Sequence, residues 1–440
     1  MSQPPATAPD RALPWTCPFC PLHCDGFAID ARAASPTLVG SDCGRAKAAL
    51  GQFKRAVSPA QPQVDGVACD LERAIGIAVG YLAASRQPLF GGLGTDVAGA
   101  RALYRLACDT GAICDAAQGP ALMHGLRAMQ DRGAFTTTLA EVRERADVIV
   151  CVGPSPAAQF PEFFRRCGVG ERREDGSILP RHVVLFGDAV DEGVACDVAE
   201  AGLGGFGALP GIGTEAVALQ GDLHDAVNLL AALVGGRNVR DASAALVGLA
   251  RRLLEARYAV IAWQPGTLPA QGALVVEAIN RIVNSLNRST RAAALPLGGG
   301  DGAATVNQVF TWLSGLPLRS RAGPAGLEHE PLCFEADRLL QRGAVDCLLW
   351  VQSFPAGTAP PDTRLPCIVL GHPGMAPTQA RDAVFIPVGT PGVGCAGHLF
   401  RSDGVVLMPV HAVLPDGLPT VAEVLGRLTG ALRASRGNVE

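Results

Sequence analysis

The fold of this 440-residue chain is decided by the stretch Asp147-Val-Ile-Val-Cys-Val-Gly-Pro-Ser-Pro156. After the aspartate comes an uninterrupted apolar run, VIVCV, which is typical of a parallel strand covered on both faces. Glycine and proline follow the run at once, and both are turn residues. We therefore predict a buried strand from Asp147 to Val152 that ends in a tight turn.

The same short apolar runs, separated by amphipathic helices, recur along most of the chain. Leu71 to Ser85 predicts one helix, and Thr95 or Asp96 is placed to cap another. This alternation predicts an α/β fold with doubly wound parallel sheets. Further strands are predicted at Pro88 to Phe90, Ala112 to Asp115, His182 to Phe186, Tyr258 to Trp263, Ala292 to Leu297, Asp346 to Val351, Pro366 to Leu370 and Ala383 to Pro387.

Three glycine-rich turns are candidates for touching a cofactor, because ligands of such sheets bind beyond the carboxyl ends of the strands. These turns are Gly91 to Thr95, Val152 to Pro156 and Gly298 to Gly302. Each is a weak signal by itself, since glycine and proline are ordinary turn residues. The chain has no G-x-x-x-x-G-K-[ST] motif and no G-x-G-x-x-G directly after a predicted strand, so kinase-like and NAD-dependent functions lose most of their support.

Near the start of the chain, Cys17, Cys20, Cys24 and Cys43 form a comb with the spacing C-x2-C-x3-C-x18-C. Four thiolates are the ligands of a cubane [4Fe-4S] cluster, and three of them within one loop can bind one side of it. A structural zinc also accepts four thiolates, although it typically takes them from two separated pairs. Unliganded thiols are a third interpretation. His23 lies inside the comb and is expected to flank a cluster rather than ligate it.

Composition argues against several other classes of function. The net charge is −4 without a basic run, which argues against a nucleic-acid surface. No apolar stretch reaches the ~18 to 20 residues of a membrane helix, and the first residues do not form a secretory signal, so we expect a cytoplasmic protein. Only 18% of residues are charged, which indicates either burial against partner subunits or a coding bias that gives 35 arginines and two lysines.

Three motifs carry a resemblance to a known family. They are Thr138 to Val150 followed by Gly153-Pro-Ser-Pro156, Val306-Asn-Gln-Val-Phe-Thr-Trp312 with Gly315 and Pro317, and Gly394 to Gly404, which ends in Arg-Ser-Asp-Gly. Together with the comb they resemble the B subunits of formylmethanofuran dehydrogenase and of the bacterial formyltransferase/hydrolase complex, which are related to molybdenum/tungsten-pterin (molybdopterin) oxidoreductases. The expected units are a cysteine-rich segment at 1–56, a first lobe from 66–130 and 330–425, a second lobe at 131–329, and a tail at 426–440.

The chain departs from this family at the position that binds the redox metal. The resemblance places a cysteine or selenocysteine ligand, followed by histidine, in the loop that here reads Ala116-Ala-Gln-Gly-Pro120. Ala117 has no lone pair for a metal, and Gln118 cannot exchange a proton near neutral pH. We therefore expect no molybdopterin or tungstopterin and no catalytic residue. Gln118, Gly119, Gly153 and Ser155 are expected in vestigial pterin-side loops.

Two functions follow from the resemblance. The first is a scaffold, with homologues of the A, C and D subunits transferring a formyl group from tetrahydromethanopterin to a furan carrier and hydrolysing it to formate. The alternative is an active pterin-dependent dehydrogenase subunit with electrons passing through the cluster. A stand-alone electron-transfer protein has less support, because so large an α/β body would be excessive for holding one cluster.

Overall fold

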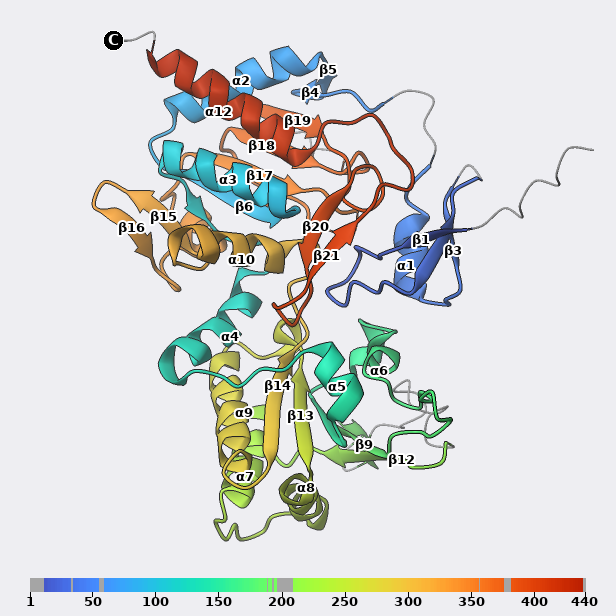
Figure 1. Cartoon of the computed structure of the whole chain (residues 1–440). Helices are drawn as coiled ribbons and strands as arrows, with labels where there is room; N and C mark the ends of the chain where they lie inside the picture. Colours follow the sequence, from blue (N-terminus) through green and yellow to red (C-terminus); the bar gives the residue numbers. More distant parts are fainter. Residues whose placement is uncertain are drawn as a thin grey trace, which may run out of the picture.

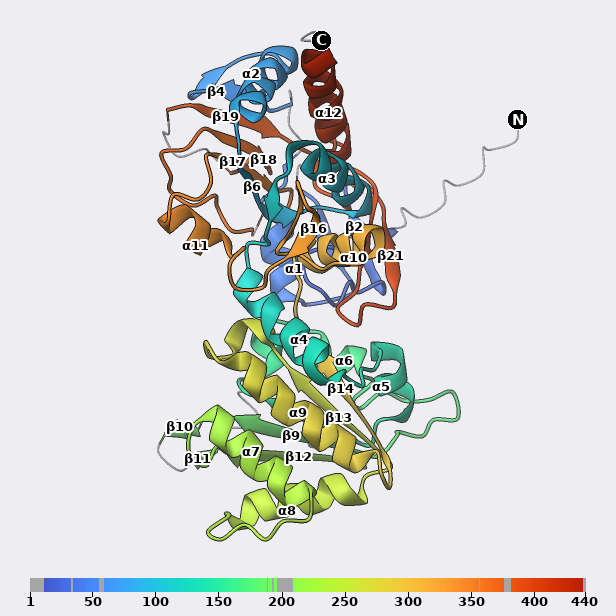
Figure 2. The ribbon, with the colours of Figure 1, turned by 90° about the vertical axis from the view of Figure 1, so that its left-hand side faces the viewer.

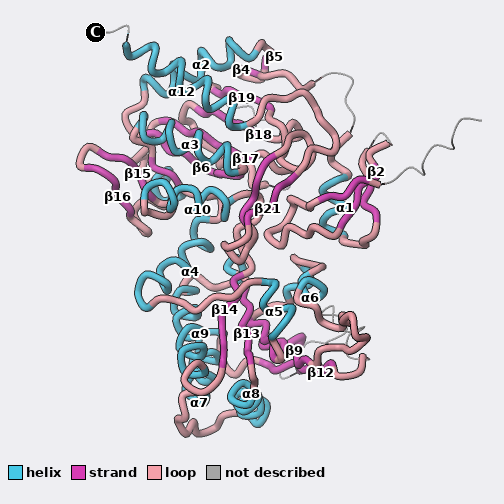
Figure 3. The backbone as a smooth tube through the Cα atoms, in the orientation of Figure 1, coloured by secondary structure: helices cyan, strands magenta, loops and turns pink. Residues whose placement is uncertain are grey.

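The structure is a computed structural model that describes residues 12–32, 35–54, 59–187, 189–191, 194–195, 209–355, 357–375 and 381–437. Two α/β lobes lie one above the other, and a small segment, residues 12–54, lies beside both (Figure 1). We call residues 12–54 the cysteine segment. Figure 3 shows strands at the centre of each lobe and helices around them. The predicted α/β class with parallel sheets in two lobes is confirmed.

Lobe II, the lower lobe of Figure 1, is built on a five-stranded parallel sheet in the order β12-β9-β8-β13-β14. The central strand is the VIVCV run. Its Val148, Val150 and Val152 face one hydrophobic cluster, whereas Ile149 and Cys151 face another. This two-sided burial is the reason for the unbroken apolar run. The strands are β8 (Val148–Val152), β9 (Arg181–Gly187), β12 (Ile212–Ala218), β13 (Tyr258–Trp263) and β14 (Arg291–Pro296).

Helices cover both faces of this sheet. Helices α7, α8 and α9 cover one face, and the short helices α5 and α6 lie on the other with the cysteine segment. Side chains cap three of the helices at their first turn: Thr138 for α5, Asp222 for α7 and Ser243 for α8. The bounds are α5 (Leu139–Arg145), α6 (Phe163–Arg166), α7 (Leu223–Val234), α8 (Ala244–Glu255) and α9 (Gly272–Leu286).

Lobe I is built on a nine-stranded sheet in the order β16-β15-β7-β6-β17-β18-β19-β4-β5. Its five central strands, β7 to β19, run parallel, and antiparallel hairpins extend both edges. The strands are β4 (Gln63–Val64), β5 (Val67–Ala68), β6 (Pro88–Gly94), β7 (Ile113–Cys114), β15 (Ser320–Gly323), β16 (Gly326–His329), β17 (Cys347–Gln352), β18 (Cys367–Gly371) and β19 (Ala383–Pro387).

Four helices cover one face of the lobe I sheet, and α11 lies on the opposite side (Figure 2). Asp96 caps α3 by accepting N–H bonds from Ala98 and Gly99, as its position before the helix predicts. The helices are α2 (Leu71–Ala84), α3 (Val97–Thr110), α10 (Ala303–Ser314), α11 (Ala336–Gln341) and α12 (Val421–Gly437).

The structure corrects the expected unit boundaries. Helix α4 (Gly119–Arg132), expected in the first lobe, packs against α9 of lobe II. Helix α10 packs against α3, and Ser320 of β15 pairs with Cys114 of β7, so the chain has returned to lobe I well before residue 330. The expected tail at 426–440 also differs: α12 continues to Gly437, because its buried Leu428 and Leu432 pack in the lobe I core.

The cysteine segment contains a three-stranded antiparallel sheet of β1 (Leu13–Trp15), β2 (Phe27–Asp30) and β3 (Thr37–Val39), followed by helix α1 (Gly44–Leu50). A hairpin of β20 (Gly397–Phe400) and β21 (Leu407–Val410) extends from lobe I towards it. Trp15 donates from its indole N–H to the carbonyl of Gly392, 2.7 Å away, and so ties the segment to lobe I. In the described part of the chain, no helix has both the length and the apolar character needed to cross a bilayer.

Candidate functional site

The glycine turns of the two lobes meet at one place. A Cβ on Gly302 would overlap the backbone of Thr95, and a Cβ on Gly94 would lie 2.8 Å from the carbonyl oxygen of Asp301. The turn after β6 and the turn after β14 are therefore packed backbone against backbone. Only glycine permits this approach, and Gly302 also has a φ of +81°.

The turn after β8 joins this meeting point through a short 3-10 helix, Pro265–Thr267. Pro265 lies against Gly298, and Thr267 lies against Gly153. The buried side chain of Gln264 donates to the carbonyl of Pro154 at 2.8 Å. Gly91 to Gly94, predicted as part of a turn, instead continue strand β6, and the end of this strand gathers with the other two turns at the carboxyl ends of both parallel sheets, where this class of fold binds ligands.

The four comb cysteines lie beside these turns and are all buried as free thiols. Gly300, in the turn after β14, lies against Pro21 of the comb loop. A backbone bond from the Cys17 N–H to the Cys24 carbonyl, at 2.9 Å, closes the loop that carries the first three thiols. Burial raises the pKa of the Cys17 thiol well above its ordinary value, and the charges of Cys20, Cys24 and Cys43 raise it further. All four cysteines belong to one buried hydrophobic cluster.

The spacing of these sulfurs distinguishes between two kinds of metal site. Sulfurs around a tetrahedral zinc, with Zn–S bonds of about 2.3 Å, lie about 3.8 Å apart, whereas those around a cubane cluster lie roughly 6 to 7 Å apart. Among the described residues, only Asp222, His224 and Asp225 form a group of three or more potential ligands that all lie within 4.8 Å of one another. No three of the comb sulfurs therefore all lie within 4.8 Å of one another, as they would around a bound zinc.

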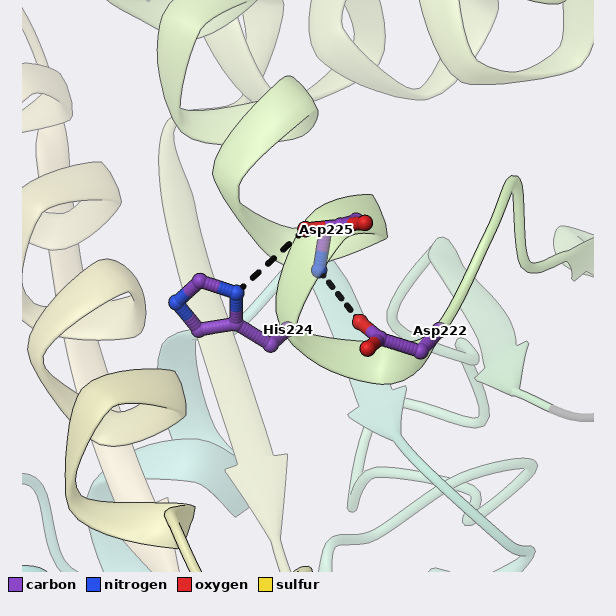
Figure 4. Close-up of side chains that lie close together, drawn as sticks. All are labelled: Asp222, His224 and Asp225. Carbon is purple, nitrogen blue, oxygen red and sulfur yellow. Dashed lines mark hydrogen bonds and ion pairs between the residues drawn. The ribbon is translucent and has the colours of Figure 1, made fainter.

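Asp222, His224 and Asp225 lie at the first turn of α7, on the surface of lobe II (Figure 4). Asp222 accepts the N–H of Asp225 at 2.8 Å as the cap of that helix, and His224 contacts the carboxylate of Asp225 at 3.4 Å. These contacts are those of an ordinary helix N-terminus.

The surroundings of the comb suit an anionic cluster. Burial raises the pKa of the Cys17 and Cys20 thiols, and the nearby backbone of Phe19 and Leu22 opposes that rise. Burial raises the pKa of Cys20 to about 11, while the nearby Arg45 opposes that rise. Burial raises the pKa of Cys24, and Arg166, which pairs with Asp25 at 2.5 Å, opposes that rise. Four buried thiols with two arginines nearby are a donor set that fits a [4Fe-4S] cluster.

His23 flanks the comb, as expected. Its ring nitrogen Nδ1 lies 3.2 Å from the carbonyl oxygen of Cys17, and its backbone has a φ of +40°. Burial lowers its pKa to about 4, so the imidazole is neutral at physiological pH.

The Arg-Ser-Asp-Gly turn between β20 and β21 connects the cysteine segment to both lobes. The Ser402 N–H donates to the carbonyl of Pro21 at 2.8 Å, and Asp403 accepts the N–H of Leu139 at 3.2 Å. Arg401 forms a buried ion pair with Asp403 at 2.6 Å. This turn therefore helps position the comb relative to lobe II.

The loop from Ala116 to Pro120 follows β7 and leads into α4, as predicted from the resemblance. The Ala117 N–H donates to the carbonyl of Gly92 at 3.0 Å, so the backbone is fixed against the turn after β6. Gln118 is the residue before α4; it is exposed and makes no side-chain cap bond. Gly119 is buried, and a Cβ there would overlap the carboxylate of Asp115.

A buried ion pair lies directly beneath this loop. Asp115 and Arg319 are 3.2 Å apart, with side chains that are 1% and 3% exposed. Asp115 also accepts the N–H of Ala336 at 2.9 Å, and Glu335 lies 3.7 Å from Arg319. Burial raises the pKa of Asp115 to about 6, although Arg319 opposes the rise. The carboxylate is committed to Arg319 rather than free to face a ligand.

On the lobe II side, Gly153 and Ser155 lie in the turn after β8. Gly153 has a φ of +86° and donates its N–H to the carbonyl of Phe186 at 2.9 Å. The hydroxyl of Ser155 accepts the N–H of Ala157 and so caps a short 3-10 turn, Pro156–Ala158. Gly153 therefore has a structural role in the turn, and Ser155 has one as a cap, independent of any cofactor.

Sequence reasoning missed several polar residues at this meeting point. Asp115 ends a predicted strand, which is a detectable signal, but Arg319 lies 204 positions away and carries no motif. Buried Gln264 and Gln352 lie at the ends of strands, and no local pattern marks them as parts of one site.

No family model matches the chain. The chain is 31% identical to the B subunit of the formyltransferase/hydrolase complex of Methylorubrum extorquens, over 84% of this chain and 97% of that protein. The chain belongs to this B-subunit family. A solved structure of the Methylorubrum extorquens formyltransferase/hydrolase complex with methylofuran contains a chain that superposes with a TM-score of 0.71 at 30% identity, covering 85% of this chain and 99% of that one.

Archaeal relatives extend the family likeness over more of the chain. The B subunit of a tungsten-containing formylmethanofuran dehydrogenase from Methanocaldococcus jannaschii is 26% identical over 91% of this chain and 94% of that protein. The corresponding protein from Methanococcus maripaludis is 24% identical over 94% of this chain and 96% of its own length. This member of the B-subunit family thus resembles components of both a formyltransferase/hydrolase and dehydrogenases.

Proposed function

We propose that this B-subunit homologue is a scaffold within a formyltransferase/hydrolase-type complex and that it has lost the redox metal of the dehydrogenases. The observation that carries this proposal is the loop after β7. Ala117 stands where the family resemblance implies the metal-ligating cysteine, and its methyl group cannot ligate a metal. The loop itself keeps its place in the fold through the Ala117 to Gly92 backbone bond.

The side chains around this loop support the same conclusion. Gln118 does not titrate, and the nearby carboxylate of Asp115 is held by Arg319 beneath the loop. His124, one turn into α4, has its pKa lowered by burial, with Arg127 and Arg319 adding to the effect. Catalytic acid/base pairs need two groups with suitable pKa values facing the reacting atoms. The described loop instead offers the side-chain amide of Gln118, backbone groups, and the carboxylate of Asp115, which is already paired with Arg319.

The complex that we infer acts in the cytoplasm on one-carbon units. Homologues of the A, C and D subunits would transfer a formyl group from tetrahydromethanopterin to a furan-type carrier and hydrolyse it, completing the oxidation of formaldehyde to formate. The four-subunit complex to which the relative belongs supports such an assembly. We propose no direct role for this chain in the transfer or the hydrolysis.

Cys17, Cys20, Cys24 and Cys43 would hold a [4Fe-4S] cluster. Such a cluster supplies one-electron transfer when bound. In a protein without the pterin metal it would chiefly connect the cysteine segment to the lobes. Arg45 and Arg166 would offset its negative charge from two sides.

The alternative function is an active molybdenum- or tungsten-pterin dehydrogenase subunit. The likeness to components of two tungsten-containing dehydrogenases favours it. Metal analysis of the complex purified with its partners separates the two functions. About one molybdenum or tungsten per chain would support the dehydrogenase and overturn the scaffold, whereas a content below about a tenth of that supports the scaffold.

A further inference from the structure

A surface groove of about 460 Å³ runs between helices α3 and α12 of lobe I. The two helices lie side by side at the top of the molecule (Figure 2). Small residues spaced four apart line the groove: Ala98 and Ala102 on α3, and Ala422, Gly426 and Gly430 on α12. A stripe of this kind allows the backbone of another helix to approach closely.

Gly426 and Gly430 of α12 are not required by packing inside this chain. A Cβ at Gly426 or Gly430 would meet no atom within 4 Å. Glycine within a helix costs about 0.5 to 1 kcal/mol relative to alanine, and internal packing does not require the small residue here. A helix seated in the groove from outside would require it.

Arginines border the groove. Arg101 and Arg105 are exposed, lie one turn apart on α3, and form no hydrogen bond or ion pair within the described part of the chain. Like charges at this spacing destabilise a helix by about 0.2 to 0.5 kcal/mol. Arg433 borders the groove from α12 and is fixed by Asp109 at 2.7 and 3.1 Å. The groove is therefore apolar at its floor and positive at its edge.

We propose that this groove is the docking site for an acidic α-helix of a partner subunit, with carboxylates at i and i+4 that pair with Arg101 and Arg105. The proposal rests on the proposed function, because it requires the partner subunits. A second copy of this chain does not match: among its described helices, none carries two acidic residues at i and i+4. Helix-in-groove docking needs both features found here, an apolar floor and charges that set the orientation.

The first test compares two groove variants with matched controls in the complete complex. Gly426→Leu fills the floor of the groove. The double variant Arg101→Glu with Arg105→Glu reverses the charge at its edge. Gly248→Leu in α8, where a Cβ also meets nothing within 4 Å, and Arg251→Glu with Arg288→Glu are the controls. We expect each groove variant to weaken association with homologues of the A, C and D subunits at least tenfold, and the controls to change it less than twofold.

Misfolding is separable from lost docking in this design. Leucine has a higher helix propensity than glycine and open space at position 426, so the thermal midpoint of the free chain should be unchanged or higher. Wild-type association should also weaken with added salt, since exposed ion pairs are screened. If the wild-type chain binds its partners and both groove variants bind equally well, the groove proposal is wrong and the proposed function stands. If the wild-type chain binds none of them, both are overturned.

A second measurement tests the chemistry of the occupant. Arg105→Lys keeps the charge and introduces an amine that carbodiimide joins to a carboxylate in direct contact. Few other cross-links are expected from this chain, because it has only two lysines, Lys47 and Lys54. We expect the new lysine to be joined to an aspartate or glutamate in a helix of a partner subunit. A cross-link that forms only to a second copy of this chain would overturn the proposal. So would the absence of any cross-link in an assembled complex.

Discussion

The comb of the cysteine segment and the loop from Ala116 to Pro120 lie on either side of the same meeting point of turns, yet they differ in what they retain. The comb keeps four buried thiols with Arg45 and Arg166 nearby. The loop keeps only its backbone position, through the Ala117 to Gly92 bond. The comb has the side chains that a metal site needs. The loop from Ala116 to Pro120 has the backbone position of a metal-binding loop without a ligand side chain.

This difference between the two regions shows that a fold can hold a loop in its place even when the loop lacks side chains that could ligate a metal. The loop after β7 is held by elements that the fold needs anyway: the turn after β6, the Asp115–Arg319 pair and the start of α4. Beside the comb, Arg166 pairs with Asp25 through Nη1 at 2.5 Å, and only its buried Nε has no hydrogen-bond partner among the described residues. Nη2 of Arg319 beneath the loop likewise has no hydrogen-bond partner among the described residues, so the two regions differ in their four thiols and not in their arginines.

The largest expected effect is at the comb. Cys43→Ser should remove the visible absorbance of an iron–sulfur cluster and nearly all of the iron, because one of four ligands is lost. Cys108→Ser, which changes an exposed cysteine outside the comb, should leave both unaltered. Iron content and absorbance are the measurements. If the anaerobically purified wild-type complex contains no iron, the comb is a relic and both regions are vestigial.

The next effect concerns the buried pair beneath the loop. Asp115→Asn leaves the buried Arg319 with only the longer 3.7 Å contact to Glu335, and breaking a buried pair in this way typically costs about 3 to 5 kcal/mol in the free energy of unfolding. Denaturant titration measures this loss. Asp109→Asn, which disrupts the exposed pair with Arg433, should cost less than about 1 kcal/mol. A similar small loss for Asp115→Asn would mean that the pair does not stabilise the loop.

A smaller effect should appear in the pH dependence of stability. His372 contacts Phe53 of the cysteine segment with ring centroids 5.0 Å apart, and burial lowers its pKa to about 4. The unfolded chain takes up this proton near pH 6.5 and the folded chain only near 4. Stability from this group is therefore complete above about pH 6.5 and is lost as the pH falls to about 4, by up to about 3 kcal/mol.

Unfolding titrations at several pH values measure this dependence. His372→Gln should reduce the slope of the profile between about pH 6.5 and 4, with the slope from buried His23 remaining, whereas His411→Gln, at an exposed position, should leave the slope unchanged. Identical profiles for the wild type and His372→Gln would contradict the burial of this histidine under the cysteine segment.

The smallest expected effect is at the loop itself. Gln118→Ala should change formate production by the assembled complex less than about twofold, because the side chain is exposed and performs no chemistry in the scaffold. Steady-state kinetics of formate release provide the measurement. A drop of roughly a hundredfold, about 2.7 kcal/mol of barrier, would show that the loop still takes part in the reaction.

Much of the secondary structure was predictable because most of the central strands are short apolar runs between turns. Predicted strands such as Tyr258 to Trp263 and Ala383 to Pro387 match β13 and β19 at both ends. Strand β12, at the edge of its sheet, was missed because its residues Ile212–Ala218 mix polar and apolar side chains without a clear period. An edge strand is covered less completely, so its sequence carries less of the signal.

The sequence by itself determined the α/β class, most of the central strands and the candidate ligands, because these depend on local runs, turn residues and close spacing. Only the tertiary structure decided which lobe each segment joins: α4 packs on α9, and α10 returns to α3. It also brought Arg319 to Asp115 across 204 positions and seated the comb between the lobes. Such contacts depend on complementary surfaces that form only after the sheets assemble, and no local pattern encodes a partner so distant in the chain.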